Sequence, residues 1–242
     1  MSDVALVTDA SSELGEAIAL RLAAGGYELA LHTRAGVEEL VFLCEKARAR
    51  GVRALAVRAD LADEAAVKRM VSEAERALGP LTLVVNNGGV VREHEAPGLA
   101  TPDGSIAEAN LRAALHVCRA VVEGMRRRRR GRIINVCSVA CELAAVGRAP
   151  EQAERAGLNG LTKTLARELA RDQVTVNSIC PGFMAAPMQR MPRAVRSKVI
   201  AKIPLGRFGE PAAVGEAVAY LAGPGGDWVT GQVLRVNGGM TM

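Results

Sequence analysis

The chain has 242 residues, of which 49% are hydrophobic but only 2% aromatic, so aliphatic side chains must supply most of the core. This length is typical of one α/β domain with a large buried core. A net charge of +5 at pH 7 is compatible with acidic partners but identifies none. No long apolar run occurs, and no basic segment precedes an apolar one at the start. We therefore expect no membrane span, no signal peptide and a cytoplasmic location.

Short apolar runs alternate with longer amphipathic segments along almost the whole chain. In the first helical segment, Leu14, Ile18 and Leu22 form an apolar stripe. Strands are predicted at 4–8, 27–33, 52–58, 81–86, 132–138, 174–179 and 232–236, and helices near 13–25, 37–50, 63–78, 104–127, 151–171 and 210–222. This alternation predicts right-handed crossovers and a doubly wound, seven-stranded parallel sheet with helices on both faces. No linker or repeat interrupts it, so we expect one domain spanning 1–242.

The cysteines are odd in number and show no spacing typical of metal ligands. They are Cys44, Cys118, Cys137, Cys141 and Cys180. We expect reduced cytosolic thiols and no metal site. Ser138 with its neighbouring cysteines could indicate a nucleophile, but no histidine lies close by in the chain, which disfavours that role.

Characteristic motifs follow the predicted strands. The turn after the first strand reads VTDASSELGEA and contains one glycine, Gly15. The later motifs are Thr33-Arg34, Asp60-Leu61, Asn86-Asn87-Gly88-Gly89, Ser138 and Pro181-Gly182, and the chain ends in LRVNGGMTM. Over its whole length this pattern resembles the short-chain dehydrogenase/reductase family. It is most similar to the bacterial 3-oxoacyl-[acyl-carrier-protein] reductases, or ketoreductases.

The resemblance implies a Rossmann-like fold and a site for NADP(H). The implied contacts are Arg34 with the 2′-phosphate, Asp60 and Leu61 with the adenine, Asn87 within the NNAG-like motif, and Pro181 and Gly182 on the nicotinamide side. The threonine that the family places after this last loop, to hold the carboxamide, is absent from FMAAPM.

The phosphate-binding turn departs from the family pattern TGxxxGxG, because Asp9 and Glu13 replace two of its glycines and Gly15 is retained. Those glycines let the backbone approach the cofactor diphosphate. A carboxylate about 5 Å from a diphosphate charge costs on the order of 3 kcal/mol at an effective dielectric constant near 20. Aspartate tolerates unusual backbone angles, and acidic side chains suit a helix N-terminus. We expect the turn to be kept and the phosphate site to be lost or badly impaired, unless both side chains point away.

The catalytic positions are altered as well. In the family a serine polarises the substrate carbonyl, an asparagine holds a relay water, a tyrosine donates the proton, and a lysine lowers the tyrosine pKa and binds the ribose. Asn110 and Ser138 match this pattern, whereas Glu151 and Arg155 replace the tyrosine and the lysine. A glutamic acid of ordinary pKa is protonated in only about 1 in 500 molecules at pH 7, and a nearby arginine opposes protonation further.

The altered pair also suits a purely structural role. Pro150 fits the first position of a helix and Glu151 fits its positive end. Glu151 and Arg155 are also spaced i, i+4 in the favourable orientation. The alternative is a new acid/base role for Glu151 that works without hydride transfer.

Possible interaction surfaces are read from charge and residue size. The run Arg126–Arg130 suits the C-terminal end of a helix, and by resemblance Arg129 and Arg171 match the positions at which related reductases dock an acyl carrier protein. Nucleic acid is disfavoured because no aromatic residues interleave with this run. Residues 183–205, with three methionines among basic residues, correspond to the family's substrate lid. Small residues at Ala153, Ala156, Gly157 and Gly160 suit close packing of this helix against a neighbouring subunit. The resemblance implies a dimer or a tetramer, because members of the family commonly form tetramers through this helix, and a hetero-oligomer with a related reductase is the alternative.

Two functional hypotheses follow. The first is a non-catalytic partner subunit of an active ketoreductase in fatty acid or polyketide biosynthesis. The second is an enzyme, either a weak NADP-dependent reductase or a cofactor-free isomerase, dehydratase or cyclase that uses Glu151 and Ser138. A carrier-protein-binding module is a third class, which depends on the arginine run alone.

Overall fold

The computed structural model describes residues 2–88, 105–143, 149–189 and 191–242. The strands are β1 (Val4–Val7), β2 (Glu28–Thr33), β3 (Ala54–Arg58), β4 (Leu81–Asn86), β5 (Gly131–Val136), β6 (Val174–Pro181) and β7 (Val233–Val236). The helices are α1 (Glu13–Ala24), α2 (Val41–Arg48), α3 (Glu64–Leu78), α4 (Ser105–Arg128), α5 (Ala149–Leu169), α6 (Ala185–Gln189), α7 (Arg193–Ile200) and α8 (Pro211–Ala222). Every strand named from the sequence is present.

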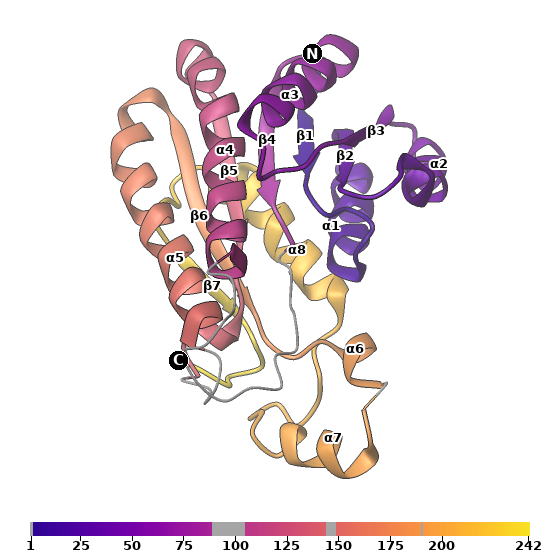
Figure 1. Ribbon diagram of the computed structural model, residues 1–242, viewed down its shortest axis with the longest axis vertical. Coiled ribbons are helices and arrows are strands. Elements are labelled where there is room, and N and C mark those ends of the chain that lie inside the picture. Colours follow the sequence, from indigo (N-terminus) through magenta and orange to yellow (C-terminus); the bar gives the residue numbers. More distant parts are fainter. Residues whose placement is uncertain (1, 89–104, 144–148, 190) are drawn as a thin grey trace.

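All neighbouring strands are parallel, and their order is β3-β2-β1-β4-β5-β6-β7. The order reverses between β1 and β4, which is where sheets of this kind form a crevice at the carboxyl ends of the strands. The predicted Rossmann-like, doubly wound sheet is therefore confirmed (Figure 1).

Alternating side chains on each strand divide the core into two layers. Ala5 and Val7 of β1 pack with α1, α2 and α8 on one face, whereas Val4 and Leu6 pack with α3, α4 and α5 on the other. This division follows from the two-residue period of a strand. Both layers are almost entirely aliphatic, as the low aromatic content requires.

Capping and apolar spacing explain why the helices form where they do. In α3, the buried residues Val67, Met70, Val71, Ala74 and Leu78 follow a helical period. Its first turn is capped by the Asp63 carboxylate, which accepts a hydrogen bond from Ala65 N at 2.8 Å. The predicted helix at 37–50 is shorter than expected, because 37–40 forms a 3-10 turn and α2 begins at Val41. No helix in the described part of the chain is long and apolar enough to cross a membrane.

Candidate functional site

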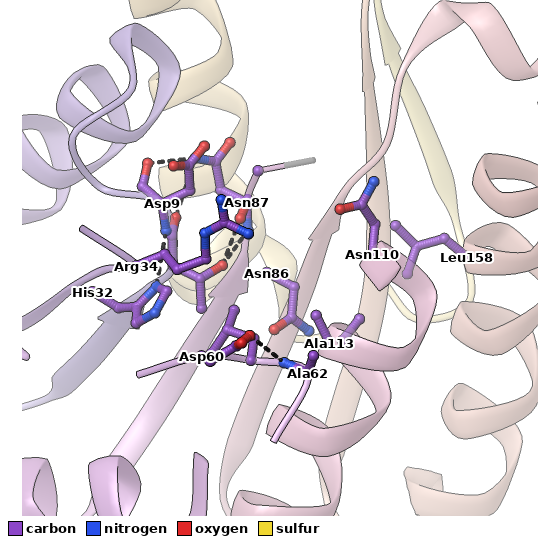
Figure 2. A pocket seen from close by; sticks show the side chains of 14 residues that line it. Asp9, His32, Arg34, Asp60, Ala62, Asn86, Asn87, Asn110, Ala113 and Leu158 are labelled. Carbon is purple, nitrogen blue, oxygen red and sulfur yellow. Dashed lines mark hydrogen bonds between the residues drawn. The ribbon is translucent and has the colours of Figure 1, made fainter. Parts of the chain in front are cut away.

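A cavity of about 410 Å³ opens at the carboxyl ends of β1 to β4 (Figure 2). Its lining comes from the loops after these strands, from α4 and from α5: Thr8, Asp9, His32, Arg34, Asp60, Leu61, Ala62, Asn86, Asn87, Gly88, Asn110, Ala113, Ala114 and Leu158. Eight of the residues singled out from the sequence therefore meet here: Asp9, Arg34, Asp60, Leu61, Asn86, Asn87, Gly88 and Asn110. Glu13, Gly15, Ser138, Arg155, Pro181 and Gly182 are not among the lining residues of this cavity.

The turn that carries Asp9 is held by Asn87. Asn87 Nδ2 donates to the carbonyl oxygens of Thr8 and Asp9, each at 3.2 Å, and the Thr8 hydroxyl donates to Asn87 O at 2.6 Å. Asp9 itself has φ of 49°, in the left-handed region that aspartate, asparagine and glycine adopt most readily. The expectation that aspartate preserves this turn agrees with that angle. The Asn87 amide, which the resemblance assigns to the cofactor site, thus also joins β4 to the first turn.

Gly15 is needed for a close approach in the same turn. A Cβ atom at Gly15 would lie 2.3 Å from Asp9 O and 2.7 Å from Ala10 Cα. Ser12 caps the helix beside it, with its hydroxyl oxygen accepting a hydrogen bond from Gly15 N at 3.1 Å. The glycine kept from the motif therefore has a packing role that is independent of any ligand.

The two acidic residues of the turn point in different directions. Glu13 is exposed and begins α1, where its charge complements the helix dipole. Asp9 is half-buried, lines the cavity and packs over Gly88, since a Cβ at Gly88 would lie 2.9 Å from Asp9 Oδ2. Burial raises the pKa of the Asp9 carboxyl, and the neighbouring His32 partly opposes that rise. The sequence alone could not distinguish these two orientations.

His32 is a cavity residue that the sequence reading missed. Its Nδ1 accepts a hydrogen bond from Asp9 N at 3.3 Å, while its Nε2 lies 3.1 Å from Ala59 O. This pair of partners is satisfied by the neutral ring with its proton on Nε2. Burial lowers the pKa of His32, which favours the same neutral form. The only sequence signal was a histidine within a buried strand, which indicates no role.

A line of buried polar side chains runs from the cavity across the sheet. Asn86 Nδ2 donates to Asn135 Oδ1 at 2.8 Å, Asn135 Nδ2 donates to Thr162 Oγ1 at 2.8 Å, and Thr162 Oγ1 donates to Leu158 O at 2.9 Å. Within the described residues, Asn86 Oδ1 is buried and has no hydrogen-bond partner. This network links β4, β5 and α5 behind the cavity.

The residues at the catalytic positions make contacts of their own. Ser138 Oγ accepts a hydrogen bond from Ala140 N at 3.2 Å and caps a 3-10 turn, Val139–Cys141. Arg155 Nη1 donates to Cys137 O at 3.3 Å, at the end of β5. The backbone of Glu151 lies in the first turn of α5, as expected, but its side chain lies outside the described part of the structure.

The loop after β6 is fixed by packing. Pro181 ends the strand and is buried, and Gly182 N donates to Val236 O at 3.0 Å. A Cβ at Gly182 would lie 2.7 Å from Asn237 Cα, so only glycine fits against the C-terminal segment. In the 183–205 segment, Met184 and Met188 are buried.

The basic residues expected to dock a carrier lie at the other end of the sheet. Arg129 and Arg171 are exposed, and Arg129 Nη2 donates to Arg171 O at 3.0 Å. Arg129 lies just before β5 and Arg171 just before β6, whereas the cavity lies at the opposite, carboxyl ends of the strands. Figure 1 shows the C-terminal ends of α4 and α5 at the top and α6 and α7 at the bottom.

Three of the four small residues in α5 remain exposed: Ala153, Ala156 and Gly160. Gly157 instead faces α4, because a Cβ there would lie 3.0 Å from Leu111 Cδ2. Oligomerisation through this helix stays a prediction.

A doubly wound parallel sheet with a crevice at its switch point is the architecture of the Rossmann-like α/β proteins, which bind their ligands at that crevice. A family model described as enoyl-(acyl carrier protein) reductase matches residues 10–241. The chain belongs to the short-chain dehydrogenase/reductase family. It is 36% identical to the 3-oxoacyl-[acyl-carrier-protein] reductase FabG of Staphylococcus aureus strain Mu50, over 100% of this chain and 99% of that protein.

Two solved structures extend the comparison. A putative short-chain alcohol dehydrogenase from Sinorhizobium meliloti 1021 superposes with a TM-score of 0.91 at 30% identity, covering 99% of this chain and 97% of the other. A blue fluorescent protein from a metagenomic library, in complex with NADPH, gives a TM-score of 0.89 at 33% identity, covering 99% and 98%.

Proposed function

We propose that this protein is a ketoreductase homologue that lacks normal NADPH-dependent reduction. We infer that it acts as a non-catalytic partner subunit of an active ketoreductase in acyl-carrier-protein-linked fatty acid or polyketide biosynthesis. The observation that carries the proposal is the Asp9 carboxylate, which lies in the cavity against Gly88.

The cavity residues fit a phosphorylated dinucleotide only in part. Arg34 and Asp60 stand at the rim with the charge and hydrogen-bonding groups that a phosphorylated ribose and an adenine would meet. On the other side, the Asp9 carboxylate occupies the turn at which this class of fold receives a diphosphate. Two like charges so close together are unfavourable in a half-buried site. This turn therefore does not fit the diphosphate of a bound dinucleotide.

Proton donation supports the same proposal. The family's tyrosine position holds Glu151, and an ordinary carboxyl group is almost fully ionised at neutral pH. At the lysine position, the Arg155 guanidinium donates to the backbone at the end of β5, and its planar fork does not reproduce the compact charge of an ammonium group.

The alternative is an enzyme that works with Glu151 and Ser138, either as a weak reductase or as a cofactor-free isomerase, dehydratase or cyclase. The retained cavity, with Asn110 in its wall, favours this alternative. Loss of turnover in Glu151→Gln would support it, and unchanged turnover would remove Glu151 from the mechanism.

The decisive experiment is calorimetric titration of the isolated protein with NADPH, with an intact ketoreductase as the positive control. At neutral pH we expect millimolar NADPH to leave the protein unsaturated, with binding too weak for a micromolar Kd, and no reduction of a 3-oxoacyl thioester. A micromolar Kd together with turnover would contradict the proposal.

The partner role needs a separate test. We would mix the protein with each reductase paralogue from the same organism and identify complexes by native mass spectrometry. A hetero-oligomer whose reductase activity exceeds that of the paralogue alone is the expected result. A stable homo-oligomer with no affinity for any paralogue would overturn this role.

Docking of an acyl carrier protein at Arg129 and Arg171 is a further part of the proposal. Because these residues lie at the end of the sheet opposite the cavity, a carrier bound there would not cover the cavity of the same protomer. Charge reversal in Arg129→Glu should weaken carrier binding, whereas Arg34→Glu at the other end should leave it unchanged. Equal binding by wild type and Arg129→Glu would exclude this surface.

A further inference from the structure

Three cysteine thiols from separate segments converge beside Ser138. The Sγ atoms of Cys137, Cys141 and Cys180 all lie within 4.8 Å of one another, and those of Cys137 and Cys141 are 3.8 Å apart. All three residues are free cysteines. None of them is among the residues that line the cavity at the carboxyl ends of β1 to β4. The cluster is therefore distinct from that cavity.

Strand register and one tight turn bring the thiols together. Val136 of β5 pairs with Ile179 of β6, and Cys137 N donates to Ile179 O at 2.7 Å, which places Cys137 beside Cys180 on the next strand. The 3-10 turn after β5 then folds Cys141 back over them, with Cys141 N donating to Ser138 O at 3.2 Å. The sequence spacing shows no metal-ligand pattern because the third thiol comes from a neighbouring strand.

The spacing of the sulfur atoms matches that of thiolates around one metal ion. With metal–sulfur bonds of about 2.3 Å, two thiolates lie about 3.8 Å apart in tetrahedral geometry and about 4.0 Å apart in trigonal geometry. The sulfur atoms of Cys137 and Cys141 already have the first of these separations. A disulfide, by contrast, needs the sulfurs at about 2.05 Å, so two of the thiols would have to move much closer.

The surroundings favour a thiolate. The pKa of Cys141 is lowered because the Cys137 and Cys180 thiols and the Asn159 amide donate to its sulfur, and because Arg155 is nearby. Asn159 Nδ2 lies 3.7 Å from Cys141 Sγ, and Asn159 is itself fixed by Ser178, whose hydroxyl donates to Asn159 Oδ1 at 2.9 Å. Asn159 therefore holds the Cys141 sulfur in place beside the other two thiols.

Burial gives the cluster an outer ligand and two inner ones. Cys137 and Cys180 are buried, whereas Cys141 is partly exposed. An ion can therefore arrive through Cys141 and then be enclosed by the other two sulfurs. Three sulfur donors in an apolar setting select soft, thiophilic cations over Mg²⁺ or Ca²⁺.

We propose that Cys137, Cys141 and Cys180 form a binding site for one thiophilic d¹⁰ metal ion, Zn²⁺ or Cu⁺. Binding joins the ion to three sulfurs and releases the protons of the ligating thiols to solvent, with no change of oxidation state. Zn²⁺ completes its tetrahedron with a water molecule, whereas Cu⁺ is satisfied by the three sulfurs. An occupied site ties the end of β5 to β6 and fixes the turn that carries Ser138.

The test uses the full-length, reduced protein under anaerobic conditions. Co²⁺ serves as the optical probe, because cobalt–thiolate bonds absorb intensely in the near ultraviolet and tetrahedral Co²⁺ absorbs strongly in the visible. Zn²⁺ and Cu⁺ are then titrated in separate arms against chromophoric chelators selective for each ion. We expect one ion per chain, proton release on binding and a raised melting temperature.

Variants assign the ligands. Cys141→Ser, at the partly exposed position, should fold normally and lower metal affinity at least about 100-fold, more than the loss of a hydrogen-bond partner of a ligand usually costs. Cys44→Ser removes a buried thiol in α2, away from the cluster, and should leave affinity unchanged. The proposal is wrong if Co²⁺ gives no thiolate absorption and the protein takes neither Zn²⁺ nor Cu⁺ from its chelator. It is equally wrong if Cys141→Ser retains wild-type affinity.

Discussion

Removing the charge of Asp9 should raise the affinity for NADPH. Asp9 is half-buried in the cavity and packs over Gly88, and burial raises its carboxyl pKa. A diphosphate charge about 5 Å away would be opposed by about 3 kcal/mol at an effective dielectric constant near 20. Solvent at the cavity mouth reduces this figure, so we expect Asp9→Asn to tighten NADPH binding by about 10- to 100-fold.

Two further variants separate charge from space. Asp9→Gly should bind at least as tightly as Asp9→Asn, since it also clears the space over Gly88 and glycine readily adopts the observed φ of 49°. Glu13→Gln is the matched control, because Glu13 carries the same charge in the same turn but is exposed and outside the cavity. Calorimetry should show only a small increase in NADPH affinity for Glu13→Gln.

The pH dependence gives an independent check. Because the folded-state pKa of Asp9 lies above its ordinary value, the neutral acid becomes populated at a higher pH than for an exposed aspartate. NADPH affinity of the wild type should therefore rise as pH falls through that pKa, and most of this rise should vanish in Asp9→Asn. His32 lies beside Asp9 and also titrates, so a smaller rise can remain in Asp9→Asn. If neither Asp9 variant binds more tightly than wild type, the electrostatic reasoning is refuted.

Three more outcomes follow from packing. Gly15→Ala places a methyl group 2.3 Å from a backbone oxygen and should lower the free energy of unfolding by about 1–3 kcal/mol in urea titrations, whereas Gly160→Ala, with open space around it, should not. Asn135→Ala leaves two buried polar side chains without their shared partner and should cost about 2–4 kcal/mol in the same assay; a cost below about 1 kcal/mol would contradict the assigned network. Trp228 is 99% exposed, so Trp228→Ser should change the free energy of unfolding by less than about 0.5 kcal/mol. A larger loss of stability that is seen only at high protein concentration would reveal a subunit contact.

The sequence predicted the sheet well because buried parallel strands are nearly continuous apolar runs. It placed β3 two residues early, at 52 instead of Ala54, since Val52 is apolar but precedes the strand. It could not orient Asp9 and Glu13, because both are acidic residues near a helix start and only the backbone turn aims one of them into the cavity.

The cysteine cluster escaped prediction for a different reason. Cys137 and Cys141 are close in sequence, but Cys180 joins them only through the register of β5 with β6. Register between parallel strands depends on crossover connections that carry no local signature. Spacing along the chain gives no information about side chains that meet from adjacent strands, so the sequence could not show that these three thiols lie together.

The separation of the two core layers from the strand ends has a consequence for engineering. The packing that holds the sheet together lies along the strands and the helix faces, whereas most of the cavity wall is formed by residues at or just past the strand ends. Most residues that line the cavity can therefore be substituted without changing the packing of the core. Because few positions line the cavity, the protein is a convenient scaffold on which new activities can be introduced one substitution at a time.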